Sequence, residues 1–393
     1  MTVFGGPRNQ IYLPLTYGVA ASPDGQRIYV SSPGIRAIYV IDTLSNLVVD
    51  LISLDSPPSA LAVSPDGTLL YATTYSNLAV INLATKASVA NPAVGLTPLG
   101  VAATPDGSKI YVTNYNSDSV SVITTKNFKV KSTISLAVPG SLVAPSPVTI
   151  SPDGATAYVV LSGASSVAVL DTNRDSIIAM IPVGPGPTSV AFTPDGHRAY
   201  VTYGSTVSII DTASQTVTAN LEIGDQIEAV GVGAQGDYAW VTHPFSQQVS
   251  VIDTTTNAVT TASTPSTTWS VAINDIRMAV DIQPGMFPNV ISLNGSGRVQ
   301  VAILSRPGFS APDQIYRAQL TFGHTGHEQS LISCNAKGDD VNHDGLPDLV
   351  CWFDTAQSNL QLGDTVGIVR ATIFNGGPVA LVTGIDSVKI TAN

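Results

Sequence analysis

The residues best suited to chemistry lie in one acidic run near the C-terminus, Asp340-Val-Asn-His-Asp-Gly-Leu-Pro-Asp348. Oxygen-bearing side chains stand at its first, third, fifth and ninth positions, and a glycine stands sixth. Ca²⁺ takes six to eight oxygen ligands, and alternate residues of a tight loop can supply several of them. The run therefore predicts a structural calcium site. Its expected ligands are Asp340, Asn342, Asp344, the carbonyl oxygen of Leu346, and Asp348.

The run departs from an EF-hand loop in two ways. Its twelfth position is Cys351 instead of glutamate, and a predicted strand follows it instead of a helix. It resembles the shorter loops of dockerins and integrin-type repeats, so a further ligand has to come from elsewhere. Asp339, Asp354 and Asp364 are the candidates. The alternative is an Asp-rich turn without a metal, which Asx-turn hydrogen bonding would allow.

The two cysteines, Cys334 and Cys351, flank this loop. A pair this close around a turn predicts a disulfide, and a disulfide indicates an oxidising compartment. Such a bridge would contribute on the order of 3 kcal/mol by the loop-entropy estimate. The alternative is two free, buried thiols in a cytosolic protein.

No local motif of nucleophilic or phosphate chemistry occurs in the sequence. His324-Thr-Gly-His327 lacks the spacing and third ligand of a metal site, so a polar loop is the favoured interpretation. Glu222, Asp225 and Glu228 form the densest acidic group of the repeat region, where a general acid or base and a solvated loop are both open interpretations. His243 follows a predicted strand and could reach a rim.

The elements that must position these residues come from an internal repeat. A Pro-Asp-Gly turn recurs every 40 to 47 residues and is flanked by runs in which apolar and polar residues alternate. Proline presets φ, aspartate bonds its own backbone and glycine accepts positive φ, so each copy predicts a hairpin. The copies are Ser22–Gly25, Ser64–Gly67, Thr104–Gly107, Ser151–Gly154, Thr193–Gly196 and the degenerate Ala234–Asp237.

Four short strands per repeat are typical of a propeller blade, whose two faces only neighbouring blades can cover. The expected fold is therefore all-β: a propeller of six four-stranded blades, possibly seven, over residues 1–264. The run Asn9–Leu13 could close the ring by pairing with the last blade, or Thr267–Ile273 could help to build a partial seventh. The polar run Thr260–Thr267 is interpreted as a linker, and residues 265–393 as a β-sandwich domain.

Composition limits the partners. Lys plus Arg number 17 against 28 Asp plus Glu, a net charge of −11, so an anionic nucleic acid is not expected to bind. No apolar run is long enough to cross a membrane. Residues 1–6 have neither a basic nor an apolar signal region, so we expect that any secretion signal is absent from this chain. The oligomeric state is not indicated.

Tyr111-Val-Thr-Asn114 resembles the signature of the YVTN family of β-propeller repeats, which occur in surface-layer and exported proteins. Variants of it recur in the other blades, such as Tyr200-Val-Thr-Tyr203. The resemblance implies an extracellular, cell-surface or periplasmic binding protein that uses its propeller rim or channel to hold a protein or glycan. Similar propellers also include lactonases and lyases, so the alternative is an enzyme of lactonase, hydrolase or lyase type with its site at the channel mouth.

Overall fold

The structure is a computed structural model that describes residues 2–5, 9–12, 17–43, 47–233, 236–264, 280–286, 289–293, 297–305, 310–335, 338–373 and 380–391. Contacts divide the chain into two compact units. The first consists of residues 1–3, 11–42 and 47–274, and the second of residues 4–10, 43–46 and 275–393.

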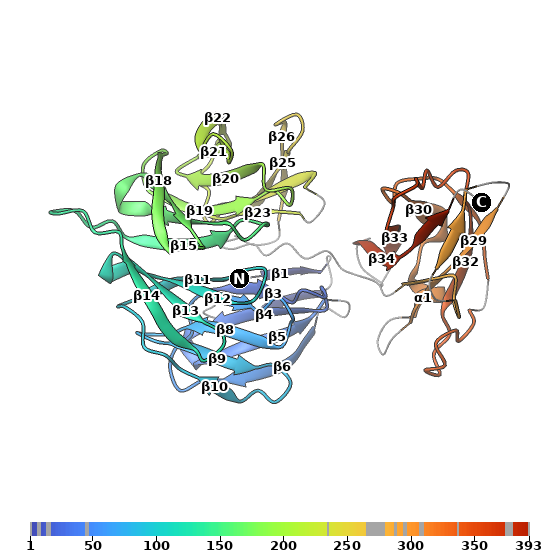
Figure 1. Cartoon of the computed structure of the whole chain (residues 1–393), viewed down its shortest axis with the longest axis horizontal. Helices are drawn as coiled ribbons and strands as arrows, with labels where there is room; N and C mark the ends of the chain where they lie inside the picture. Colours follow the sequence, from blue (N-terminus) through green and yellow to red (C-terminus); the bar gives the residue numbers. More distant parts are fainter. Residues whose placement is uncertain are drawn as a thin grey trace. The chain divides into compact units, whose positions relative to one another are not determined.

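The described residues of the first unit form six four-stranded antiparallel sheets, which we call blades 1 to 6 (Figure 1). Blade 1 is β3 (Val19–Ala21), β4 (Arg27–Ser32), β5 (Ala37–Asp42) and β6 (Leu47–Ser53). Blade 2 is β7 (Leu61–Val63), β8 (Leu69–Thr73), β9 (Leu78–Asn82) and β10 (Ser88–Ala90). Blade 3 is β11 (Pro98–Ala103), β12 (Lys109–Asn114), β13 (Ser119–Thr124) and β14 (Lys129–Ser135).

The remaining three blades repeat this order. Blade 4 is β15 (Pro145–Ile150), β16 (Thr156–Leu161), β17 (Ser166–Asp171) and β18 (Ser176–Pro182). Blade 5 is β19 (Pro187–Phe192), β20 (Arg198–Tyr203), β21 (Thr206–Asp211) and β22 (Thr216–Glu222). Blade 6 is β23 (Val230–Val232), β24 (Tyr238–Thr242), β25 (Gln248–Asp253) and β26 (Val259–Ser263). The expected all-β propeller is thereby confirmed.

Two boundary expectations were wrong. Strand β2 (Asn9–Tyr12) pairs with β1 (Thr2–Gly5) in a separate two-stranded sheet, and so does not complete the last blade. Residues 259–263, placed partly in a linker, form β26, whose side chains are almost all exposed. An outermost strand needs few apolar residues, which is why its sequence resembles a linker. The possible seventh-blade segment Thr267–Ile273 lies outside the described residues.

The Pro-Asp-Gly turns work as the sequence predicts. In blade 1 the Asp24 carboxylate accepts hydrogen bonds from the Ser22 hydroxyl at 2.6 Å and from the Gln26 amide at 2.9 Å. Gly25 has a φ of 71°, which favours glycine. The serine or threonine before each proline therefore ties the turn together and sets the register of the first two strands.

The YVTN motif joins neighbouring blades through its third residue. The Thr113 hydroxyl donates to the Ser146 carbonyl oxygen of blade 4. At equivalent positions the Ser31 hydroxyl donates to the Ser59 backbone carbonyl oxygen at the start of blade 2, at 2.6 Å. The Thr202 hydroxyl donates to the Glu228 backbone carbonyl oxygen at the start of blade 6, at 2.9 Å. Blades 1 and 2, 3 and 4, and 5 and 6 are therefore connected by buried hydroxyl groups.

The other two seams lack this particular bond. In blade 4 the slot of Thr113 holds Val160, which has no hydroxyl to donate. In blade 2 the same position holds Thr73, whose hydroxyl donates to the backbone carbonyl oxygen of Ala60 in its own blade at 3.4 Å. Apolar side chains pack across these seams, as Tyr158 and Val160 of blade 4 do against Val190 and Val201 of blade 5.

The second unit has two main sheets around one core. One sheet has the order β27-β29-β32-β31 and the other β30-β33-β34, with β28 and β35 as a parallel pair. Val301 and Phe353 of the first sheet share a cluster with Phe322 and Val369 of the second, which is the arrangement of a sandwich. The elements are β27 (Val280–Ile282), β28 (Val290–Ser292), β29 (Arg298–Ile303), β30 (Thr321–Gly323), β31 (Leu331–Cys334), β32 (Leu349–Asp354), β33 (Val366–Ile373), β34 (Ala380–Ser387), β35 (Lys389–Thr391) and the short α1 (Ala311–Gln314).

The chain has little helix. Single 3₁₀ turns link the second and third strands in three blades: η1 (Pro33–Ile35), η2 (Tyr115–Ser117) and η3 (Ser162–Ala164). A fourth, η4 (Arg317–Gln319), lies in the second unit. Within the described ranges no helix has the length and apolarity that crossing a membrane requires.

Candidate functional site

Strand order gives the propeller two chemically different faces. The turns between first and second strands and between third and fourth strands lie on one side, which we call the turn face. The connections between second and third strands, and those between successive blades, lie on the other side, which we call the mouth face. The short 3₁₀ turns η1, η2 and η3 therefore belong to the mouth face.

Equivalent backbone hydrogen bonds place one residue in each of blades 1, 2 and 6 just before the innermost strand. The backbone amide of Tyr17 donates to the carbonyl oxygen of Ser31 at 3.0 Å, and the backbone amide of Glu228 donates to the carbonyl oxygen of Thr242 at 3.0 Å. Ser59 is held in the same way by Thr73 at 2.8 Å. Because innermost strands surround the axis of a propeller, Tyr17 and Glu228 lie where that axis meets the mouth face.

The backbone beside Tyr17 is closely packed. Tyr17 and Gly18 both pair with Ser31, so the strand bulges there, and bulges commonly re-aim side chains beside functional sites. A Cβ on Gly18 would come within 2.4 Å of the Ser59 carbonyl oxygen, so only glycine fits this approach between blades. The close packing of Gly18 between blades 1 and 2 therefore fixes the backbone position of Tyr17.

Tyr17, Tyr115 and Glu228, which we call the mouth group, interact electrostatically. Burial raises the pKa of the Glu228 carboxyl above its usual range. Burial also raises the pKa of the Tyr17 hydroxyl, and the neighbouring Glu228 and Tyr115 raise it further. Among the described residues the Glu228 carboxylate has no hydrogen-bond or ion-pair partner. The group therefore offers a carboxylate with a raised pKa and two tyrosine side chains that act with it on one face.

His243 does not reach the rim, contrary to expectation. Its side chain is 1% exposed, and its Nε2 lies 2.8 Å from the Ser250 hydroxyl. Asn114 of blade 3 occupies the same motif position and contacts Ser121 equivalently at 3.0 Å. Burial lowers the pKa of His243, although nearby Asp225 opposes this shift. His243 is framework, and its place in the YVTN motif was the signal for that.

The other candidate side chains are dispersed. Glu222 ends the outermost strand of blade 5 and accepts a hydrogen bond from Thr206 at 2.8 Å. In the second unit, His324 Nδ1 lies 2.9 Å from the Asp364 carboxylate, whereas His327 is exposed. The two histidines therefore have different surroundings and do not form a pair.

The acidic loop of the second unit is held by its own backbone. Asp340 accepts hydrogen bonds at 3.0 Å from the amides of Asp344 and Gly345, and Asp344 accepts one from Leu346 at 2.9 Å. Asp348 is fully buried and accepts hydrogen bonds from the amides of Ser305 at 2.7 Å and of Val341 at 3.0 Å. Asn342 donates from its amide to Asp344 at 3.0 Å.

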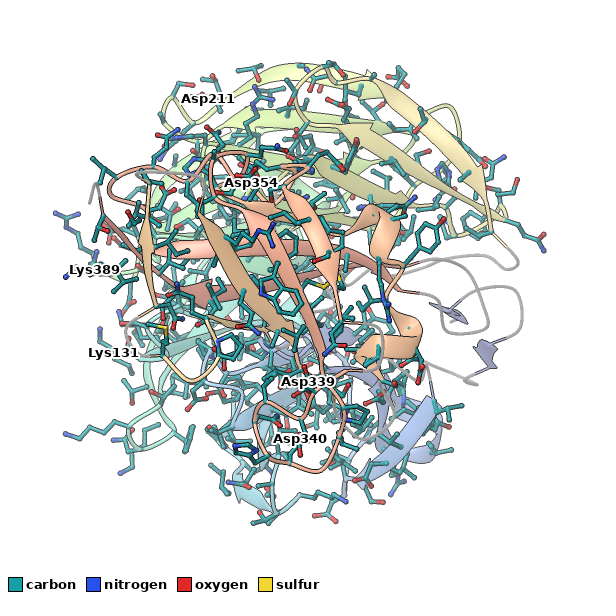
Figure 2. The ribbon with its side chains drawn as sticks, turned by 90° about the vertical axis from the view of Figure 1, so that its right-hand side faces the viewer. Lys131, Asp211, Asp339, Asp340, Asp354 and Lys389 are labelled. Carbon is teal, nitrogen blue, oxygen red and sulfur yellow. A yellow bond between two sulfur atoms is a disulfide. The ribbon has the colours of Figure 1, made fainter. Side chains whose placement is uncertain are left out.

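Of the three extra ligands considered, only Asp339 adjoins the loop. Asp339 and Asp340 lie together in it, and Asp354 lies at the other end of β32 (Figure 2). A strand of six residues spans roughly 17 Å, which separates Asp354 from the loop, and Asp364 is engaged with His324. Within the described residues no three His, Cys, Asp or Glu side chains gather closely enough to hold a metal. Calcium binding stays a prediction.

The expected disulfide is confirmed. Cys334 and Cys351 are bonded, and their Cα atoms are 3.9 Å apart at directly paired positions of β31 and β32. The bridge closes the segment that contains the acidic loop, so it restrains that loop whether or not a metal binds.

Comparison with known proteins identifies the propeller. A family model described as "Lactonase, 7-bladed beta-propeller" matches residues 43–270, more than half of the chain, and the chain belongs to that family. Among solved structures it is similar to the hydrazine synthase of Kuenenia stuttgartiensis, with a TM-score of 0.56 and 23% identity over 64% of this chain and 80% of that one. That likeness shows the fold alone. No curated protein matches the chain in a sequence comparison.

These comparisons support the propeller that the YVTN resemblance implied, but they do not support its surface-layer type. They also favour the enzymatic alternative over the binding protein expected first. Six blades lie within the described residues, whereas the family description gives seven.

Proposed function

We propose that the propeller hydrolyses lactones at its mouth face, with Glu228 as general base. The observation that carries this is the mouth group itself: a half-buried Glu228 carboxylate without a partner among the described residues, with Tyr17 in electrostatic range of both Glu228 and Tyr115. A raised pKa makes a carboxylate a better base at the pH where it works. Membership of a family named for lactonases supplies the class of substrate.

The chemistry needs three acts from these residues. Glu228 takes a proton from a water molecule as that water attacks the ring carbonyl carbon. The hydroxyls of Tyr17 and Tyr115 donate hydrogen bonds to the carbonyl oxygen as it gains negative charge. The protonated Glu228 then returns its proton to the ring oxygen as the carbon–oxygen bond breaks, and the product is a hydroxy acid. The raised pKa of Tyr17 keeps its hydroxyl protonated for this task.

Hydrolysis of uncharged γ- and δ-lactones, followed by acid release in a pH-stat, tests the proposal. Glu228→Gln should lower kcat/KM by about 100-fold or more. Glu222→Gln removes the same charge from the same face but away from the axis, and should change kcat/KM by less than about threefold. Activity should rise with pH as Glu228 loses its proton. Full activity of the Glu228→Gln variant, or no turnover of any lactone, would contradict the proposal.

A second candidate is the binding of a protein or glycan at the same face, in an exported protein. Tyr75 and Phe245 lie in mouth-face connections with 79% and 64% of their surface exposed, and exposed aromatic side chains are common at binding interfaces. The disulfide favours an oxidising location. A glycan array with wild-type protein and the Tyr75→Ala and Phe245→Ala variants tests this candidate. Unchanged binding in both variants would count against it.

A further inference from the structure

Positive charge is concentrated on the turn face of the propeller. Among the described residues of blades 1 to 6 and their connections, the mouth face has a single lysine or arginine, which is Arg36 at the end of η1. The others begin second or fourth strands or lie in the turns between third and fourth strands. They include Arg27, Lys86, Lys109, Lys131, Arg174 and Arg198.

Several of the turn-face cations form ion pairs on that face. Arg27 pairs with Asp42, and Lys86 pairs with Asp50. Lys109 and Lys131 both pair with Asp175, at 2.8 and 2.6 Å. These cations are thus engaged with carboxylates on their own side of the molecule, and contribute little field at the mouth.

The mouth face carries carboxylates with few cations among them. Asp225 and Glu228 lie three positions apart in the connection from blade 5 to blade 6, and Glu222 ends the strand before it. Asp55 follows β6 on the same face, and Asp225 is exposed. Several carboxylates with one arginine on this face produce a negative potential there, which repels anions and attracts cations.

We propose that this negative potential makes the mouth selective for uncharged lactones over anionic ones, and that it expels the product. The proposal rests on the proposed function. Hydrolysis adds water to a neutral ring and yields a hydroxycarboxylate and a proton, so the substrate enters without repulsion and the product leaves as an anion. Asp225 is the specificity-determining residue in this account, because it is exposed beside Glu228 and takes no part in the reaction.

A matched pair of substrates tests selectivity. γ-Valerolactone and the same ring with a carboxylate in place of its methyl group differ mainly in charge. At low salt we expect kcat/KM to be at least about tenfold lower for the anionic ring, and the gap to shrink as salt screens the charges. Asp225→Lys should raise kcat/KM for the anion by about tenfold and leave the neutral lactone within about twofold. Asp211→Lys, on the turn face, is the matched control and should alter neither.

A measurement without turnover separates this inference from the proposed function. Cationic and anionic nitroxide probes of similar size relax amide protons according to the local potential. The amides of Tyr17, Tyr115 and Glu228 should be relaxed at least about twice as strongly by the cationic probe, and Asp225→Lys should reduce that ratio. Equal relaxation by both probes, or equal turnover of both lactones, would overturn the selectivity. Absence of turnover with the expected relaxation would overturn only the lactonase proposal.

Discussion

Asp175 ties blade 3 to blade 4, and its replacement by asparagine gives the sharpest stability prediction. Its side chain is 4% exposed and accepts hydrogen bonds from Lys109, Lys131 and the Tyr111 hydroxyl, the last at 2.7 Å. Burial acts to raise the pKa of Asp175, but these three bonds outweigh it and leave the pKa below its usual value. Asn257 occupies the equivalent turn position with similar positive φ, so asparagine fits the backbone.

The expected loss follows from the charges left behind. Removing one partner of a buried ion pair costs about 3–5 kcal/mol. Lys109 and Lys131 are 17% and 45% exposed and can recover some hydration, so we expect about 2–3 kcal/mol for Asp175→Asn. In a domain of this size that corresponds to roughly 5–10 °C in the Tm of the propeller. Asp211→Asn, at the end of β21 where the carboxylate accepts a hydrogen bond from the Ser214 amide, should cost less than about 1 kcal/mol.

Urea denaturation at several pH values provides the assay. Because the folded-state pKa of Asp175 is lowered, its contribution is present above the unfolded pKa of about 3.9 and is lost as pH falls through the folded pKa. The difference between wild type and Asp175→Asn should therefore be full at pH 7 and shrink below about pH 4. A difference under about 0.5 kcal/mol at pH 7, or one that persists in acid, would refute the reasoning.

Three further predictions concern the rest of the molecule. Cys334→Ser with Cys351→Ser should destabilise the second unit by about 3 kcal/mol in denaturant titrations, and added reductant should do the same to wild type alone. If the acidic loop binds calcium, titration calorimetry should detect Ca²⁺ binding that Asp344→Ala abolishes, and chelator should lower the Tm of the second unit; an unchanged Tm would reject a structural role. Thr113→Val should cost about 1–2 kcal/mol through the unpaired Ser146 carbonyl, whereas a cost near zero would show that the bond between blades is unimportant.

The repeat made the propeller predictable, because turn chemistry and alternation are local properties of sequence. Asp24, Gly25 and their counterparts act within a few residues of the chain, so each copy states its own hairpin. The outermost strand β26 was missed because it is exposed on nearly every residue and lacks the apolar pattern of the inner strands. The confirmed disulfide was likewise local, since the paired cysteines lie on adjacent strands.

The mouth group was not predictable as a group. Tyr17, Tyr115 and Glu228 come from blade 1, blade 3 and the connection to blade 6, and Tyr17 is in electrostatic range of the other two only because the blades surround one axis. In the sequence Glu228 stands out only through its acidic neighbours, and no motif points to Tyr17. The available signal is positional: both residues stand two positions before the innermost strand of a blade, at a repeat position where the other blades carry serine, threonine or leucine.

The pairwise hydroxyl bonds between blades have a mechanical consequence. Ser31, Thr113 and Thr202 lock blades together two by two, while Val160 leaves the seam between blades 4 and 5 to apolar packing. When the molecule is pulled from its ends, such seams separate before the locked ones. The propeller should then unfold in steps of about two blades. The sequence repeats once per blade, but the mechanical unit is a pair of blades.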